Sequence, residues 1–364
     1  MNDTKPHSTP LLEVRELTKN FHVPGSGSRI LCALDKIDLE VSHGETLGLV
    51  GESGCGKSTL ARTLLMLEKP DEGTIRFEGT DPFGLKGKQL LAWRRRVQMV
   101  FQDPFASLNA RMTAGEIISE PWMTHKDLYP TKESRQIRLQ ELLQIVGMRA
   151  SDAGKSPQEF SGGQRQRIGI ARALALNPDV IVLDEPVSAL DLSVQAQVLN
   201  LLNDLQQRLG VAYIFISHDL SVVHHVADRV AVMYLGRIVE TGTTEEVFNR
   251  PRHPYTAALM SASPQLDVTA NETRQRIVLE GEIPSPLDPP SGCRFRTRCW
   301  KAQDICASDS PPRVGSPDSA LHVAECHFPL TPEATSELLA EASARSTTTA
   351  AQPHTITTDS GATC

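Results

Sequence analysis

Apolar residues along this chain gather in short runs separated by polar segments. The segments LLEVREL and IDLEV alternate apolar and polar positions, as half-buried strands do. The runs TLGLV, VQMVF, VIVLD, VAYIFIS and RVAVMY are nearly continuous in apolar residues, which is typical of strands buried on both faces. Amphipathic stretches such as QVLNLLNDLQQRL predict helices between them. The pattern therefore predicts an α/β fold in which helices wrap a mainly parallel sheet.

The same pattern divides the chain into segments. The first residues are polar and lack the apolar core of a signal peptide. From about Pro284 the composition shifts to Pro, Cys and Arg, which we interpret as a separate small module. The last residues have too little apolar surface to pack. The predicted segments are a polar leader (1–10), a large domain (11–250) with a helical insertion (about 113–160), a C-terminal extension (251–330) and a loose tail (331–364).

Charge and hydropathy exclude several functions. The formal net charge of −7 argues against nucleic-acid binding, because phosphate backbones attract a basic surface. No apolar run approaches the roughly 18 residues that a membrane span needs. We therefore expect a cytosolic chain whose thiols stay reduced.

A glycine-rich loop directly follows the predicted strand TLGLV. Its sequence GESGCGKS fits the phosphate-loop pattern G-x-x-x-x-G-K-S/T, in which glycines turn backbone N–H groups toward phosphate oxygens. Lys57 would supply a point charge and the Ser58 hydroxyl a ligand for Mg²⁺. Cys55 is interpreted as a small residue in a tolerant position. The predicted nucleotide-binding residues of this loop are Gly51, Ser53, Gly54, Cys55, Gly56, Lys57, Ser58 and Thr59.

Two carboxylates end another predicted strand. In VIVLDEP the apolar run is followed by Asp184 and Glu185. Ligands of open parallel sheets bind at the carboxyl ends of the strands, so both side chains are expected to face the phosphates. An isolated Asp-Glu pair would be a solvated strand end, but beside a phosphate loop Asp184 is expected to hold Mg²⁺ and Glu185 to polarise the attacking water.

Further motifs resemble one family. FSGGQRQRIGIARAL closely resembles the signature motif of ABC-type ATPases, and Gln102 in FQDP resembles their Q-loop. Asp191 in SALD resembles their D-loop, His218 in FISHD their switch histidine, and Phe21 in LTKNF the aromatic residue that stacks on adenine. The motifs occur in the family's order. The resemblance covers about 11–250 and implies a P-loop NTPase of the ABC type, with a helical subdomain, that binds ATP and Mg²⁺.

The resemblance also implies how these residues act. The signature begins a predicted helix, whose N-terminal N–H groups favour an anion such as the γ-phosphate. In the family that helix serves the nucleotide of the other subunit, so two domains dock head to tail around two ATP molecules. The implied catalytic residues are Glu185, His218 and Gln102; the Mg²⁺ ligands are Ser58, Gln102 and Asp184; the signature residues are Ser161, Gly162, Gly163 and Gln164.

The kind of ABC protein is narrowed by further resemblance. QDPFASLNARMTAGEIISEP, MYLGRIVE and RPRHPYTAALMSASP resemble the ATP-binding subunits of oligopeptide and dipeptide importers, a group that also contains nickel and glutathione systems. This implies a peripheral place on the cytoplasmic face of the membrane, two transmembrane permease subunits, an extracytoplasmic substrate-binding protein and a second ATPase subunit, for which a homologous sibling is favoured. A soluble ABC ATPase that acts on DNA or ribosomes is the alternative; the chain lacks the coiled-coil insertion or second cassette typical of those proteins.

The C-terminal extension contains four cysteines spaced C-x5-C-x6-C-x19-C, with sequence such as CRFRTRC that recurs in the peptide-importer group. This arrangement resembles an extension that binds a [4Fe–4S] cluster in some relatives. Four thiolates suit such a cluster, but they also suit a tetrahedral Zn²⁺, with His322 and His327 as substitute ligands. Free buried thiols are the third interpretation. The four residues are Cys293, Cys299, Cys306 and Cys326.

Overall fold

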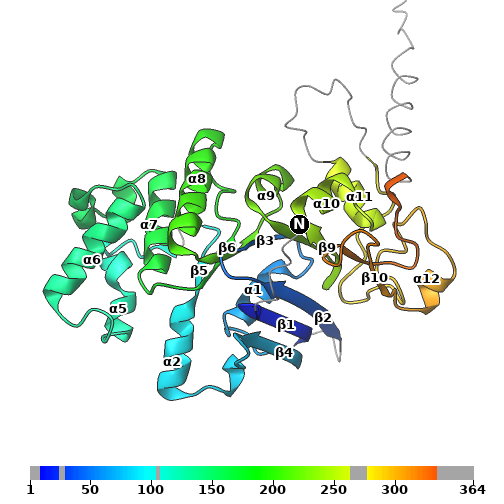
Figure 1. Ribbon diagram of the computed structural model, residues 1–364, viewed down its shortest axis with the longest axis horizontal. Coiled ribbons are helices and arrows are strands. Elements are labelled where there is room, and N and C mark those ends of the chain that lie inside the picture. The colour runs from blue at the N-terminus through cyan, green and yellow to red at the C-terminus, as the bar shows by residue number, and fades with distance from the viewer. Residues whose placement is uncertain (1–8, 24–28, 104–106, 263–276, 334–364) are drawn as a thin grey trace, which may run out of the picture.

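The protein is described by a computed structural model (Figure 1). The described residues are 9–23, 29–103, 107–262 and 277–333, so most of the predicted leader and tail lies outside them. Within these ranges no helix combines the length and the apolar character needed to cross a bilayer.

Described strands form an eight-stranded sheet in the order β10-β11-β9-β8-β3-β7-β6-β5. Strands β8, β3, β7, β6 and β5 run parallel to one another. The pairs β8–β9, β9–β11 and β11–β10 are antiparallel. The predicted mainly parallel core is therefore confirmed. The strands are β3 (Thr46–Val50), β5 (Val97–Val100), β6 (Val180–Asp184), β7 (Ala212–Ile216), β8 (Arg229–Tyr234), β9 (Arg237–Thr243), β10 (Arg313–Gly315) and β11 (Val323–Glu325).

Three further strands form a second, antiparallel sheet. The sequence pattern did not predict this sheet as a separate layer. It has the order β2-β1-β4 and lies below the main sheet in the view of Figure 1. Its strands are β1 (Leu12–His22), β2 (Ile30–Val41) and β4 (Glu72–Phe77). Strands β1 and β2 are paired, with Phe21 opposite Leu31. Leu31 lines the same cavity as the glycine-rich loop, so β2 lies beside that loop.

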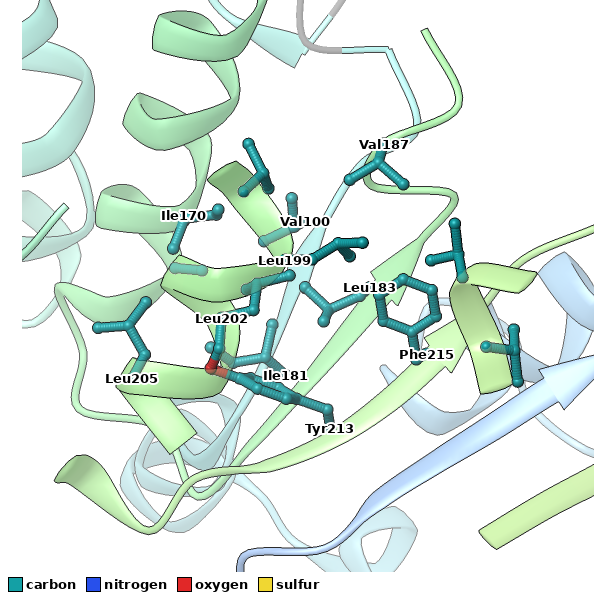
Figure 2. Packing of buried hydrophobic residues seen from close by; sticks show 14 of the residues in the cluster. Val100, Ile170, Ile181, Leu183, Val187, Leu199, Leu202, Leu205, Tyr213 and Phe215 are labelled. Atoms are coloured by element: carbon teal, nitrogen blue, oxygen red, sulfur yellow. The ribbon is translucent and has the colours of Figure 1, made fainter. Parts of the chain in front are cut away.

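Helices cover the main sheet on both faces. Leu199, Leu202 and Leu205 of α8 pack against Ile181, Leu183, Tyr213 and Phe215 of β6 and β7 in one buried cluster (Figure 2). Helix α8 begins before the predicted stretch because the Asp191 side chain caps its first turn. The α-helices are α1 (Lys57–Leu64), α2 (Gly87–Arg96), α4 (Ala114–Ser119), α5 (Pro121–Thr124), α6 (Lys132–Ile145), α7 (Gly162–Leu174), α8 (Leu192–Leu209), α9 (Leu220–Val226), α10 (Thr244–Asn249), α11 (Pro254–Ser261) and α12 (Ile305–Ser308).

The residues after Pro284 do not form the separate module expected from their composition. Strand β11 pairs with β9, and β10 pairs with β11, so they extend the main sheet. Phe295 is 1% exposed and belongs to the same apolar cluster as the sheet residues. Strands of three residues give no alternation that a sequence pattern can detect, which explains the difference.

Candidate active site

The carboxyl ends of the parallel strands meet at one edge of the main sheet, where ligands of such sheets bind. A cavity of about 560 Å³ opens there. It brings together residues from segments that are far apart in the chain. Its lining contains Leu31, Cys32, Ala33, Ser53, Gly54, Cys55, Gly56, Lys57, Ser58, Thr59, Gln102, Asp184, Glu185, His218, Leu235, Gly236 and Pro286.

The glycine-rich loop joins β3 to α1 at this edge, as its sequence predicted. Gly51 has φ of 151°, and a Cβ at this residue would lie 2.1 Å from the carbonyl oxygen of Met233. Gly56 has φ of 113° and caps α1 in a left-handed conformation. Both positions need glycine because a side chain would meet backbone or strain it. The loop can therefore approach a ligand with its backbone.

Lys57 folds back over the loop. Its Nζ donates to the carbonyl oxygens of Gly51 at 2.8 Å and Glu52 at 3.0 Å, and it lies 3.7 Å from Sγ of Cys55. Burial raises the pKa of the Cys55 thiol, and the nearby ammonium group opposes that shift. The Cys55 side chain is buried at 4% exposure, in agreement with a small residue that fills space.

The two carboxylates at the end of β6 lie in the cavity wall. Burial, followed by the charge of Glu185, raises the pKa of Asp184, while Lys57 and Arg62 oppose the shift. Two neighbouring carboxylates repel each other when both are ionised. A cation bound at Asp184 would relieve this repulsion.

Glu185 is the centre of a hydrogen-bonded group. Nε2 of Gln102 donates to its Oε2 at 2.7 Å, and Nδ1 of His218 lies 2.9 Å from its Oε1. The predicted Q-loop and switch residues therefore both contact the predicted general base. The His218 side chain is 62% exposed, so it faces the open side of the cavity.

The signature residues begin α7 and lie elsewhere. The Ser161 hydroxyl accepts a hydrogen bond from the N–H of Gln164, whose side chain accepts from the N–H of Ser161. A Cβ at Gly163 would lie 2.3 Å from Cγ1 of Val194, so this glycine permits close contact with α8. None of the described residues that line the cavity belongs to 161–164.

Three further predicted residues, all of them described, also lie outside the cavity lining: Gly51, Asp191 and Phe21. Asp191 caps α8 by accepting from the N–H of Val194 at 3.0 Å and from the Ser193 hydroxyl at 2.7 Å. Phe21 lies on β1, with Nζ of Lys19 5.2 Å from its ring centroid. Its strand partner Leu31 does line the cavity.

Sequence patterns missed part of the wall. The hairpin strand β2 contributes Leu31, Cys32 and Ala33, and the turn after β8 contributes Leu235 and Gly236. Pro286 comes from the C-terminal extension. Leu235 and Gly236 belong to the segment MYLGRIVE, but no motif marked any of these residues as part of the site. Only the pairing of distant segments places them there. Cys32, which the sequence left without a role, is one of them.

The surroundings of the cavity fit a nucleotide with Mg²⁺. Of the described side chains, none caps the first turn of α1, so its N–H groups are available to donate hydrogen bonds to an anion. Ser58 and Asp184 offer the oxygen ligands that Mg²⁺ prefers. When bound, the metal would neutralise phosphate charge. Lys57, Ser58 and Asp184 are the residues that would hold the phosphates and the ion.

The four cysteines of the extension do not support the predicted metal centre. Burial, with a smaller contribution from the neighbouring thiols, raises the pKa of Cys326 to about 12. Burial likewise raises the pKa of Cys293 to about 11. Among residues 9–23, 29–103, 107–262 and 277–333, no group of three or more His, Cys, Asp or Glu side chains is placed to hold a metal. Among the described residues these four cysteines form no disulfide.

The phosphate loop, the Asp-Glu strand end, and the glutamine and histidine around Glu185 define an ABC-type ATPase. Comparisons with known proteins agree. Residues 34–188 match the family described as ABC transporter, and residues 239–306 match the oligopeptide/dipeptide transporter C-terminal region. The dimeric ATP-binding cassette MJ0796, solved with ADP and Pi, is 29% identical with a TM-score of 0.58, over 64% of this chain and 98% of that chain.

Curated relatives identify a more specific family within the ABC-type ATPases. The oligopeptide transport ATP-binding protein AppF of Bacillus subtilis is 50% identical over 89% of this chain and 99% of its own length. The dipeptide transport ATP-binding protein DppF of Haemophilus influenzae is 50% identical over 85% of this chain and 94% of its own length. The chain belongs to the family of ATP-binding subunits of oligopeptide and dipeptide ABC transporters. The predicted family and fold class are therefore confirmed.

Proposed function

We propose that this chain hydrolyses MgATP at the cavity to power import of dipeptides or oligopeptides. The observation that carries the proposal is the contact of both Gln102 and His218 with the carboxylate of Glu185. Such a group can hold a water molecule and accept its proton beside a phosphate. Glu185 would act as general base, while Gln102 and His218 would fix its orientation and contact the Mg²⁺ and the γ-phosphate.

The proposed ATP site is completed by a second ATPase subunit. The signature residues lie at the start of α7, outside the cavity of their own chain, where N–H groups favour an anion. A head-to-tail partner would bring its own signature to the γ-phosphate held here. The dimeric relative solved with ADP and Pi supports such an assembly. A homologous sibling is favoured as the partner.

The chain is proposed to act as a peripheral subunit on the cytoplasmic face of the membrane. Two transmembrane permease subunits would form the path, and an extracytoplasmic binding protein would deliver the peptide. Hydrolysis would remove the phosphate that both ATPase subunits share and so loosen the dimer, a motion that the permeases would follow. Nickel or glutathione is the alternative cargo within the same role.

Fractionation of cells tests this assignment. The chain should sediment with membranes when the permease subunits are co-expressed and stay in the supernatant without them. The Lys57→Ala variant, which should not bind ATP, should still sediment because docking does not need the phosphate site. Binding to ribosomes or DNA, without a membrane partner, would contradict the proposal and favour a soluble ABC ATPase.

A further inference from the structure

Glu52, inside the glycine-rich loop, is held by the C-terminal extension. Its carboxylate accepts from Nη1 of Arg298, at 3.1 Å to Oε1 and 2.9 Å to Oε2. Its backbone N–H donates to the hydroxyl of Tyr255 at 3.0 Å, and its carbonyl oxygen accepts from Nζ of Lys57 at 3.0 Å. One loop residue therefore connects the extension with the lysine that faces the cavity.

Arg298 is itself fixed by burial. Its side chain is 8% exposed and that of Glu52 is 24% exposed, so the ion pair is shielded from water. Close by, Phe295 packs against Tyr234 with ring centroids 5.3 Å apart and against Tyr255 at 5.4 Å. Tyr255 is the residue whose hydroxyl accepts from Glu52. Aromatic side chains therefore pack together next to Glu52, and Arg298 of the same extension contacts the Glu52 carboxylate.

A second arginine of the extension braces the same loop indirectly. Arg294 donates through Nη1 to the carbonyl oxygen of Leu235 and through Nη2 to Asp35. The next residue, Gly236, donates its N–H to the carbonyl oxygen of Cys55 at 2.8 Å. The glycine-rich loop is therefore supported at two residues, Glu52 and Cys55. Both connections lead to the segment 294–298.

We propose that Arg298 is a positioning residue for ATP: through Glu52 it holds the glycine-rich loop in its phosphate-binding shape, so that the C-terminal extension sets the affinity for nucleotide. This inference rests on the proposed function, because it takes the cavity as the ATP site. Backbone N–H groups bind phosphate tightly only when they converge beforehand, since ordering a loose loop on binding costs conformational entropy. The ion pair is a restraint of this kind, because without Glu52 the charge of the largely buried Arg298 side chain would be left without compensation.

Dissociation constants for MgATP test the inference on the isolated full-length chain. Arg298→Gln and Glu52→Gln should each weaken binding about tenfold, and the double variant should be no weaker than the single ones, because all three remove one interaction. Arg296→Gln is the matched control. Arg296 lies two residues away and donates to Ser291 within the extension, so its change should leave the affinity unaltered.

A merely structural role of Arg298 gives a different result. It would lower the melting temperature of the variant and leave the affinity of the folded protein unchanged, which would overturn the inference. Equal weakening in Arg298→Gln and Arg296→Gln would also overturn it, because the effect would belong to the extension in general. If Arg298→Gln does not fold, Glu52→Gln decides the question from the loop side, where the residues of the extension stay intact.

The failure of this inference is distinguishable from failure of the proposed function. If the unaltered chain binds MgATP and Lys57→Ala does not, the cavity is the ATP site, and the comparison of Arg298→Gln with the unaltered chain then judges the inference alone. Absence of MgATP binding in the unaltered chain would contradict the proposed function and this inference together.

Discussion

Nδ1 of His218 lies 2.9 Å from Oε1 of Glu185, so the histidine that follows β7 contacts the carboxylate that follows β6. The two strands are parallel neighbours, with Asp184 opposite Ile216. Adjacent strand ends therefore bring a proton acceptor and an exposed imidazole to one side of the cavity. Gln102 approaches the same carboxylate from the segment after β5.

The role of Glu185 predicts the result of Glu185→Gln. The amide cannot accept a proton from water, so hydrolysis should fall by roughly 10² to 10⁴. ATP binding should persist, because the phosphate loop is unchanged. Steady-state phosphate release and nucleotide binding are the two measurements. Glu245→Gln, a change on the exposed surface of α10, is the control. Near-normal turnover would remove Glu185 from the role of general base.

The separation of the signature from its own cavity predicts a division of labour. Lys57→Ala should abolish ATP binding to this subunit. Ser161→Ala removes the cap of α7, at a cost of about 1 kcal/mol of stability, and should leave ATP binding to the isolated subunit intact. It should lower hydrolysis only in the assembled ATPase pair. A substitution at Gly163 would not test this point, because a side chain there would collide with Val194. Loss of ATP binding in the isolated Ser161→Ala subunit would contradict the head-to-tail arrangement of two ATPase subunits.

The shape of the glycine-rich loop predicts a strong effect of Gly51→Ala. The added methyl group would collide with the carbonyl oxygen of Met233 and require a strained φ. The loop must shift, so MgATP affinity should fall by at least about tenfold. Gly84→Ala, in the segment between β4 and α2, adds a methyl group in open space and should have no effect on affinity. Equal affinities for the two variants would show that the loop tolerates the change.

Much of this site followed from the sequence because its residues occupy fixed positions in motifs at strand ends. The loop from Gly51 to Thr59, the Asp184–Glu185 pair and His218 each follow a strand that the apolar runs predicted. Motifs describe residues that are close in the chain, so they could not place Cys32 or Pro286 in the cavity wall. Nor could they detect that Arg298 reaches Glu52, because that contact depends on how the extension packs against the main sheet.

Buried His253 predicts a pH dependence of stability. Burial lowers its pKa from 6.5 to about 3, and its Nδ1 accepts from the N–H of Tyr255. Above pH 6.5 the imidazole ring is neutral in both the folded and the unfolded chain. Its full contribution to the free energy of unfolding is then present. Between pH 6.5 and about 3 the unfolded chain binds a proton that the folded chain does not, so stability falls by up to about 1.4 kcal/mol per pH unit.

The His253→Asn variant isolates this contribution. Asparagine keeps an acceptor for the N–H of Tyr255 and does not titrate. Urea unfolding at pH 7 and pH 5 should show a smaller loss of stability on acidification in the variant than in the unaltered chain. Equal losses in the two proteins would mean that His253 takes up its proton in the folded state.

Transport by the reconstituted complex tests the central claim most directly. The chain is assembled with its partner ATPase and permease subunits in proteoliposomes and supplied with the substrate-binding protein, and accumulation of a labelled dipeptide is followed with and without ATP. We predict ATP-dependent accumulation that Lys57→Ala and Glu185→Gln abolish, with no competition from Ni²⁺ or glutathione. Accumulation that persists in both variants, or hydrolysis that responds to Ni²⁺ or glutathione and not to peptide, would contradict the account.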